Sequence, residues 1–345
     1  MTTHLESEIK QQPDVISRLI EREQDTTRAV AAAVREFNPA FVMIAARGTS
    51  DNAARYAQYA FGSGVGLPVA LATPSLHTLY EAPPRLDRAL VIGISQSGQS
   101  VDVMQVVTDA RQQGALTLTI TNDQDSPMAK AAHHHIWLGA GEEQSVAATK
   151  TYTASLAAAA LLLVELADDK ALREQLSLLP EHVRSTIDRI LTETGWIERY
   201  RYMERFVTLG RGYNYSTAFE INLKVKELCY LIGDAYSEAD FRHGPIATIE
   251  HGFPVMLVAP QGKTLPAMQD LIERLKAHGA EILVISNDDT TRRAAQKAMS
   301  IPALPEWLSP IVAVIPGQVF AWQLAQVRGH EVDRPRGLTK VTVTR

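Results

Sequence analysis

Short apolar runs alternate with longer segments of helical periodicity along most of the chain. A strand in the middle of a parallel sheet reads as a continuous apolar run, because helices cover both of its faces. The alternation therefore predicts an α/β fold with doubly wound parallel sheets, each flanked by helices in three layers. The predicted strands are Phe41 to Ala45, Ala89 to Ile94 and Ala115 to Thr121 in the first half, then Phe206 to Leu209, Pro254 to Ala259 and Glu281 to Ser286 in the second.

Features of the first half recur in the second half at nearly constant separation. One such match could arise by chance, but three matches in register indicate a duplicated α/β domain. The 345 residues are also enough for two domains. The matches pair Arg47-Gly48 with Arg211-Gly212 at 164 residues, Gln96 with Gln261 at 165, and the Gly-Ala pairs at Gly114 and Gly279 at 165.

The other segments connect or extend these two domains. The polar N-terminal segment and the segment between the halves have helical patterns, while Arg334-Pro335-Arg336-Gly337 suits an irregular tail. We therefore expect a helical extension at residues 1–35, a first domain at 36–167, a helical linker at 168–198, a second domain at 199–330 and a tail at 331–345.

The composition is that of a folded protein, with 46% hydrophobic and 21% charged residues. The 34 basic and 39 acidic residues give a net charge of −5, and no basic stretch is long enough to neutralise a nucleic-acid backbone, so we expect no nucleic-acid partner. The first ten residues lack a signal-peptide pattern, and no run approaches the roughly 18 apolar residues of a membrane span. We therefore expect a cytoplasmic protein. The single cysteine, Cys229, excludes an internal disulfide and lies among apolar neighbours, which favours the core over a reactive thiol.

A hydroxyl-rich loop follows the predicted strand Ala89 to Ile94. It reads Ser95-Gln96-Ser97-Gly98-Gln99-Ser100, and a helical pattern begins at Val101. A helix start with unpaired N–H groups, surrounded by three hydroxyls, can hold a phosphate without lysine, and Thr49 and Ser50 after the neighbouring strand could add two more. The alternative is that Ser95 or Ser100 only caps the helix. The chain has neither a P-loop nor a Gly-x-Gly-x-x-Gly turn, which disfavours nucleotide triphosphates and nicotinamide cofactors.

Candidate acid and base groups lie in the second half. A helix predicted over Tyr215 to Leu231 carries Lys224 and Glu227 on one face, where an ordinary surface ion pair is the alternative. His243-Gly244-Pro245 follows in a loop-like stretch, and loops over a rigid sheet are where catalytic groups tend to lie. A carboxylate base and a histidine that titrates near neutrality are what aldose–ketose chemistry requires. The consecutive residues His133 to His135 would alternate between faces of a strand, which disfavours a metal site.

Together these segments resemble the isomerase domain of glucosamine-6-phosphate synthase, a family built from sugar isomerase (SIS) domains. The resemblance covers essentially the whole chain and implies two tandem SIS domains, a homodimer, a hexose 6-phosphate substrate, and no metal or organic cofactor. The segments that carry it are Glu8-Ile9-Lys10-Gln11-Gln12-Pro13, Arg47-Gly48-Thr49-Ser50, Ser95-Gln96-Ser97-Gly98, Val146-Ala147-Ala148-Thr149-Lys150, Lys224-Val225-Lys226-Glu227, His243-Gly244-Pro245 and Arg334-Pro335-Arg336-Gly337-Leu338-Thr339-Lys340.

The resemblance also implies roles for particular residues. Glu227 matches the base that moves a proton between C1 and C2, and Lys224 matches its neighbouring lysine. His243 matches the ring-opening histidine, which the family supplies from the partner subunit, and Lys340 matches a tail lysine able to form a Schiff base. The positions that match sugar or phosphate contacts are Thr49, Ser50, Ser95, Gln96, Ser97 and Ser100.

Three departures from the family pattern bear on the reaction. Ser100 replaces the commoner threonine but keeps the hydroxyl, whereas Ala148 replaces a serine, so a hydroxyl contact to the sugar is expected to be missing. No glutaminase domain is recognised, so we expect no release of ammonia from glutamine.

We therefore expect a hexosamine-6-phosphate deaminase that converts glucosamine 6-phosphate and water to fructose 6-phosphate and ammonia. A fructosamine-6-phosphate deglycase or a plain aldose–ketose isomerase would use the same base. A sugar-phosphate sensor is the alternative of another class, but Glu227, His243 and Lys340 together exceed what binding alone needs.

Overall fold

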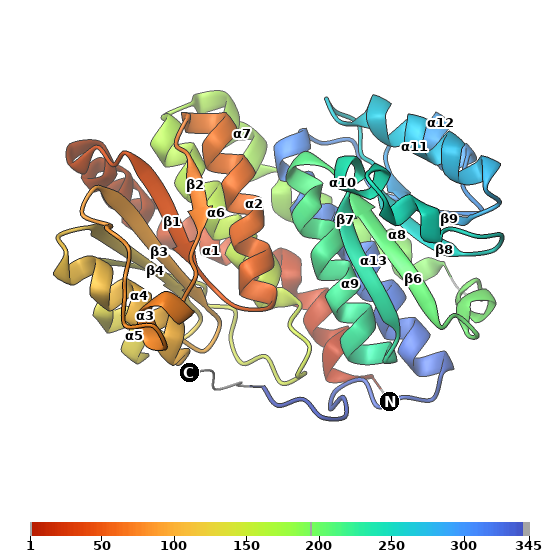
Figure 1. Cartoon of the computed structure of the whole chain (residues 1–345), viewed down its shortest axis with the longest axis horizontal. Helices are drawn as coiled ribbons and strands as arrows, with labels where there is room; N and C mark the ends of the chain where they lie inside the picture. The colour runs from red at the N-terminus through yellow and green to blue at the C-terminus, as the bar shows by residue number, and fades with distance from the viewer. Residues whose placement is uncertain (1, 194, 341–345) are drawn as a thin grey trace. The chain divides into compact units, whose positions relative to one another are not determined.

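The structure, a computed structural model, describes residues 2–193 and 195–340 (Figure 1). The chain forms two compact units. Of the described residues, the first unit contains 14–143, 150–178 and 339–340, and the second unit contains 2–13, 144–149, 179–193 and 195–338. The long helix α1 (His4–Phe37) contributes its start to the second unit and the rest to the first.

The sheet of the first unit has five parallel strands in the order β2-β1-β3-β4-β5. By right-handed crossovers, α2 lies on one face and α3, α4 and α5 on the other, while α6 packs on α2 (Figure 1). The elements are β1 (Phe41–Ala45), α2 (Thr49–Val65), β2 (Val69–Leu71), α3 (Ser75–Thr78), β3 (Ala89–Ser95), α4 (Val101–Gln112), β4 (Leu116–Thr121), α5 (Pro127–Ala131), β5 (His134–Trp137), α6 (Lys150–Ala167) and α7 (Lys170–Ser177).

The second unit repeats this topology, because its order β7-β6-β8-β9-β10 is the order of the first sheet. Helix α13 packs on α8 and α9. The elements are α8 (Leu179–Thr192), η1 (Ile197–Tyr200), β6 (Arg205–Gly210), η2 (Gly212–Asn214), α9 (Tyr215–Cys229), β7 (Ile232–Ser237), α10 (Glu238–Arg242), η3 (Pro245–Thr248), β8 (Pro254–Val258), α11 (Leu265–Ala277), β9 (Glu281–Ser286), α12 (Asp289–Arg293), β10 (Lys297–Ser300), η4 (Glu306–Leu308) and α13 (Ser309–Val327).

The predicted α/β fold with two repeats is confirmed. All six predicted strands form, each with ends within one residue of the prediction, and four further strands, β2, β5, β7 and β10, were not predicted. Helix α9 ends at Cys229 rather than at Leu231, because Tyr230 takes the left-handed conformation with φ 57°.

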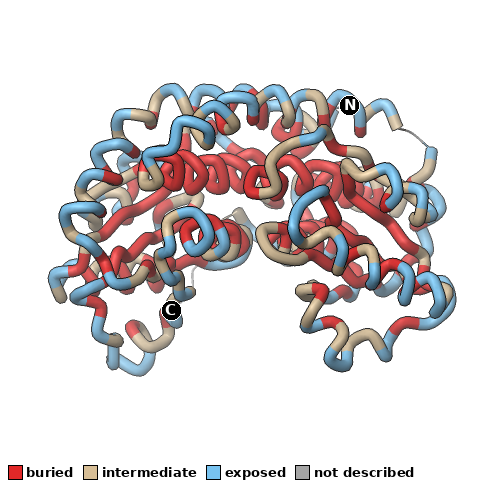
Figure 2. Tube along the Cα trace, turned by 90° about the horizontal axis from the view of Figure 1, so that it is seen from above, coloured by how far each residue is buried: buried red, intermediate tan, exposed pale blue. Residues whose placement is uncertain are grey.

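The apolar core of each unit lies between its sheet and its helices (Figure 2). All seven residues of β3 are buried, as expected of a strand covered on both faces. Cys229 is also buried, with its Sγ 3.3 Å from the carbonyl oxygen of Ala321, and burial raises the pKa of its thiol to about 12. Cys229 is therefore a core residue, as predicted.

Among the described residues, two helical segments are long and apolar enough to cross a membrane, Lys150–Ala167 and Glu306–Val327. This corrects the expectation that no run approaches a membrane span. An 18-residue apolar stretch of the first is 89% buried inside the structure and one of the second is 94% buried, and the core helices of globular proteins can have the same length and composition.

Candidate active site

The hydroxyl-rich loop lies at the carboxyl edge of the first sheet. It joins β3 to α4, and β3 pairs directly with β1, which is followed by Thr49 and Ser50 in the first turn of α2. The direction of the strand order reverses between β1 and β3, and ligands of open α/β sheets bind at such a switch point. The fold therefore brings together the starts of two helices and both sets of predicted phosphate ligands.

The serines of this loop have different environments. Ser95 Oγ accepts a hydrogen bond from the amide of Gly98 at 3.2 Å and lies 3.3 Å from Ser100 Oγ, while Ser97 Oγ accepts from the amide of Gln99 at 3.3 Å. Ser100 occupies the N-cap position of α4, but its side chain makes no capping hydrogen bond. Ser100 therefore stands at the position of a capping serine, but its hydroxyl does not cap the helix.

Tertiary contacts fix the shape of the loop. Gly98 has φ 64°, and a Cβ there would lie 2.1 Å from Ser126 Oγ, so only glycine fits. Arg47 Nε lies 2.7 Å from the fully buried carboxylate of Asp102, whose other oxygen accepts from the amide of Val103 at 2.9 Å. This ion pair joins the segment after β1 to the first turn of α4. The helix dipole also stabilises a carboxylate at this position.

Lys340 lies in the same unit as the loop. Its Nζ is 2.8 Å from Oε2 of Glu143, whose side chain is fully buried. Glu143 belongs to the segment that follows β5, at the same edge of the sheet as the loop.

The candidate base lies in a buried charge cluster on α9. Lys224 is 1% exposed, and its Nζ lies 2.6 Å from Glu227 Oε2 and 3.3 Å from Oε1 of the fully buried Glu220. The alternative of an ordinary surface ion pair is therefore wrong. Glu227 keeps 21% of its side chain exposed, although its Oε2, which faces Lys224, is buried.

His243 ends the short helix α10, and Gly244 separates it from η3. The predicted loop-like stretch is therefore two short helical turns broken at the expected glycine. The His243 side chain is exposed.

The predicted site residues divide between the two units. Thr49, Ser50, Ser95, Gln96, Ser97, Ser100 and Lys340 lie in the first unit, whereas Ala148, Lys224, Glu227 and His243 lie in the second.

The three consecutive histidines lie at and before β5. His133 Nδ1 is 2.8 Å from Thr117 Oγ1 and His135 Nε2 is 2.9 Å from Thr121 Oγ1, and burial lowers the pKa of both rings. Among residues 2–193 and 195–340, no group of three or more histidine, cysteine, aspartate or glutamate side chains could hold a metal ion. The expected absence of a metal stays a prediction.

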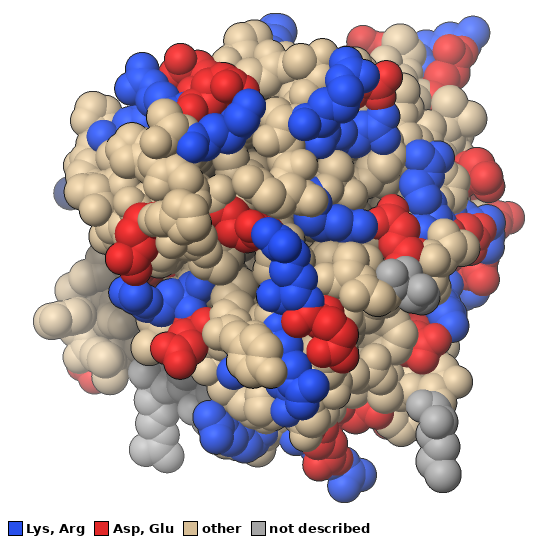
Figure 3. Space-filling model, turned by 90° about the vertical axis from the view of Figure 1, so that its right-hand side faces the viewer, with Lys and Arg blue, Asp and Glu red and all other residues tan. Residues whose placement is uncertain are grey.

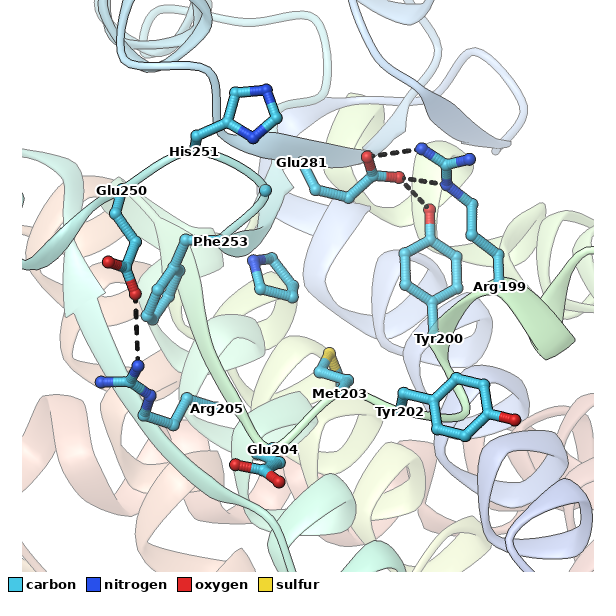
Figure 4. Close-up of a pocket in the computed structure, with 12 residues that line it drawn as sticks. Arg199, Tyr200, Tyr202, Met203, Glu204, Arg205, Glu250, His251, Phe253 and Glu281 are labelled. Atoms are coloured by element: carbon cyan, nitrogen blue, oxygen red, sulfur yellow. Dashed lines mark hydrogen bonds and ion pairs between the residues drawn. The ribbon is translucent and has the colours of Figure 1, made fainter.

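A pocket of about 620 Å³ opens elsewhere in the second unit, where β6, β8 and β9 begin (Figure 4). Arg199 forms a bidentate pair with Glu281 at 2.7 and 2.8 Å, and Arg205 lies 3.2 Å from Glu250. Because carboxylates already pair with both arginines, this pocket is poorly suited to a phosphate. It contains none of the predicted site residues.

On the face shown in Figure 3, positive and negative side chains are interspersed.

The SIS domain family model matches the chain twice, at residues 40–165 and 201–328, which correspond to the two sheets with their helices. The chain belongs to the SIS domain family. One relative, the isomerizing glutamine–fructose-6-phosphate aminotransferase of Thermococcus kodakarensis, is 34% identical over 97% of this chain and 57% of its own length. The chain therefore spans a little over half the length of that enzyme.

Solved structures share the fold over nearly the whole chain. A Silicibacter pomeroyi protein assigned as a phosphosugar isomerase is 33% identical with a TM-score of 0.86, covering 96% of this chain and 100% of that one. Glucosamine-6-phosphate deaminase from Thermotoga maritima has a TM-score of 0.80 at 21% identity, covering 99% of this chain and 100% of that one. The second likeness concerns the fold alone.

Several residues that contact the predicted site residues were not predicted from the sequence. Glu220 could have been found, because it lies one helical turn before Lys224. Asp102 and Glu143 gave no local signal, since their partners Arg47 and Lys340 are 55 and 197 residues away.

Proposed function

We propose that this SIS protein is a hexosamine-6-phosphate deaminase that converts glucosamine 6-phosphate and water to fructose 6-phosphate and ammonia. The observation that carries the proposal is the charge cluster on α9, in which buried Lys224 pairs with Oε2 of the partly exposed Glu227 side chain. A carboxylate that is fixed on one side and open on the other can take up and return a proton. A simple sugar-phosphate binder does not need such a group.

The proposed reaction rearranges protons within the sugar and adds one water. His243 opens the pyranose by passing the proton of the C1 hydroxyl to the ring oxygen, which leaves the open-chain aldehyde. Glu227 then removes the proton from C2 and returns it to C1, while the C2 amine loses a proton and the aldehyde oxygen gains one. The C2 amine thereby becomes a C2 imine and C1 becomes a CH2OH group. Water adds to the imine carbon, ammonia leaves, and the C2 ketone of fructose 6-phosphate remains. The loop from Ser95 to Ser100 holds the phosphate throughout, with Thr49 and Ser50 beside it.

The relatives support handling of a hexose 6-phosphate at a shared site. The Thermococcus enzyme is named for fructose 6-phosphate and for isomerization, and the Thermotoga neighbour is named for the deamination proposed here. A plain aldose–ketose isomerase is the second candidate, favoured by the Silicibacter protein at 33% identity. It would use the same proton shuttle without the imine.

The assembly is part of the proposal. We place the active site in a cytoplasmic homodimer in which His243 serves the partner's site, and the exposure of His243 supports this arrangement. Lys340 closes the site or forms a transient imine with the open-chain ketose. The reaction as written needs no metal, nucleotide or organic cofactor.

The test is a screen of hexosamine 6-phosphates with ammonia and ketose phosphate measured separately. Wild-type protein should release both from glucosamine 6-phosphate in equal amounts. Glu227→Gln keeps the size of the side chain but loses the base, so kcat should fall about a hundredfold to ten-thousandfold with KM nearly unchanged. Glu273→Gln, an exposed substitution on α11, is the matched control and should behave as wild type.

The outcomes separate the candidate functions. Interconversion of aldose and ketose phosphates without ammonia from any hexosamine 6-phosphate would replace the deaminase with the isomerase. Binding without turnover of any sugar phosphate would leave only the sensor.

A further inference from the structure

A fully buried carboxylate lies beside the tail lysine of the first unit. Glu143 Oε1 accepts a hydrogen bond from the amide of Thr151 at 3.2 Å, and Oε2 accepts from Thr151 Oγ1 at 2.7 Å and from Lys340 Nζ at 2.8 Å. The Glu143 side chain is 0% exposed, and that of Lys340 is 27% exposed. The cation therefore reaches inward from the tail to a charge that solvent does not touch.

Asn122 ties this segment to the phosphate loop. Its amide donates to the carbonyl of Gln96 at 3.0 Å, its side-chain oxygen accepts from the amide of Ala140 at 2.8 Å, and its Nδ2 donates to the carbonyl of Gly141 at 2.8 Å. Glu143 follows two residues later. The carboxylate that binds Lys340 is therefore connected to the phosphate loop through a single asparagine.

The position of Glu143 is also fixed from the other side. Thr151 is in the first turn of α6, so the carboxylate lies at the start of a helix of 18 residues, where a negative charge is stabilised. The neighbouring Lys150 directs its Nζ to the carbonyl oxygen of Glu142 at 2.5 Å. A buried charge of this kind is tolerated only when it is paired and hydrogen-bonded, and Lys340 supplies a charged partner.

We propose that Glu143 is a positioning residue that holds the Lys340 ammonium at the carboxyl edge of the first sheet beside the phosphate loop. The proposal rests on the function proposed above, because it assumes that Lys340 acts on the sugar phosphate bound there. Glu143 itself touches no substrate atom in this scheme. It determines where the lysine is when the open-chain sugar forms.

The first experiment measures the contact without any substrate. Full-length protein is labelled with an amine-reactive acetylating reagent, and mass spectrometry gives the labelling rate of Lys340 relative to the exposed Lys130. Glu143→Gln should raise that rate about tenfold or more, since a hydrogen bond between two charged groups is lost. Glu142→Gln removes the neighbouring exposed charge and is the matched control, with the wild-type rate expected.

A milder variant keeps the test valid if Glu143→Gln fails to fold. Thr151→Val preserves the shape of the side chain and removes one donor to the carboxylate, so the Lys340 labelling rate should rise about twofold to tenfold. If a folded Glu143→Gln protein, or Thr151→Val in its place, labels Lys340 at the wild-type rate, Glu143 does not hold the lysine.

The second experiment asks whether the contact serves the reaction. Glu143→Gln and Lys340→Met should each lower kcat. The double variant should be no slower than Lys340→Met alone, because both changes remove the same ion pair. Additive losses would make Glu143 a structural residue only and overturn the proposal. Failure of the proposed function looks different, since wild-type protein would then turn over no hexosamine phosphate while the labelling result still stood.

Discussion

Replacing Lys224 tests the charge cluster on α9 most directly. Lys224→Met keeps an unbranched side chain of similar length but removes the cation that lies between Glu220 and Glu227. Glu220 is fully buried, so the change leaves a buried carboxylate without its cation. Breaking a buried ion pair by removing one partner costs about 3–5 kcal/mol of unfolding free energy, far more than the roughly 0–1 kcal/mol of a surface pair.

The assay is urea unfolding followed by tryptophan fluorescence. Three of the four tryptophans, Trp196, Trp307 and Trp322, lie in the second unit, so the signal reports mainly on the unit that contains α9. With a denaturant slope of about 2 kcal/mol/M, the urea midpoint should fall by about 1.5–2.5 M. A Lys224→Met midpoint within about 0.5 M of wild type would refute the buried-cluster reasoning.

A compensating variant separates lost charge from lost packing. Adding Glu220→Gln to Lys224→Met removes the stranded carboxylate as well, so much of the lost stability should return. If the double variant is instead less stable than Lys224→Met, packing and not charge determines the cost. Glu227→Gln alone should cost less than Lys224→Met, because Glu227 is partly exposed.

Three further results follow from the structure. Ser97→Ala should raise KM for the sugar phosphate about tenfold to a hundredfold without changing the urea midpoint, and an unchanged KM would place the phosphate elsewhere. Mixing inactive Glu227→Gln and His243→Ala proteins should restore activity after subunit exchange, whereas no recovery would mean that each chain builds its site alone. Hydrogen bonding to Arg199 lowers the pKa of Glu281, so this pair stabilises the fold above the carboxyl's usual pKa, and the stability advantage of wild type over Glu281→Gln should shrink as the pH falls below about 4.5. Midpoints measured from pH 7 to pH 3 would contradict this if the difference stayed constant.

The strands that the sequence did not predict share one property. β2, β5, β7 and β10 are the four edge strands of the two sheets. They are mostly part-exposed, and β7 even places Ile232 in solvent at 75% exposure. A half-covered strand carries mixed polar and apolar residues, so it shows no continuous apolar run. The central strands were predictable for the opposite reason.

In the candidate site, features set by neighbouring residues in the chain were predictable, whereas features set by tertiary packing were not. The loop from Ser95 to Ser100 was predictable because strand, loop and helix start are adjacent in the chain. The burial of Lys224 was not, since it depends on how α9 packs in the second unit rather than on the Lys-x-x-Glu spacing. The contact between Lys340 and Glu143 spans 197 residues and leaves no pattern in a single sequence.

The two repeats also show why a duplicated fold need not duplicate a site. Shifting the phosphate loop by the repeat offset of 165 residues places Pro260, Gly262 and Leu265 where Ser95, Ser97 and Ser100 stand, so all three hydroxyls are lost. In their place, the carboxylate of Glu306 accepts hydrogen bonds from the amides of Lys263 and Thr264 at 2.9 and 3.3 Å and from Thr264 Oγ1 at 2.9 Å. A built-in carboxylate thus satisfies the start of α11, as an anion does at any helix N-terminus. The start of α4 is therefore a candidate phosphate site, whereas the start of α11 has an internal cap. The loops differ in backbone as well as in side chains, since the positive φ lies at Gly98 in the first loop and at Gly262, one position earlier in the repeat, in the second.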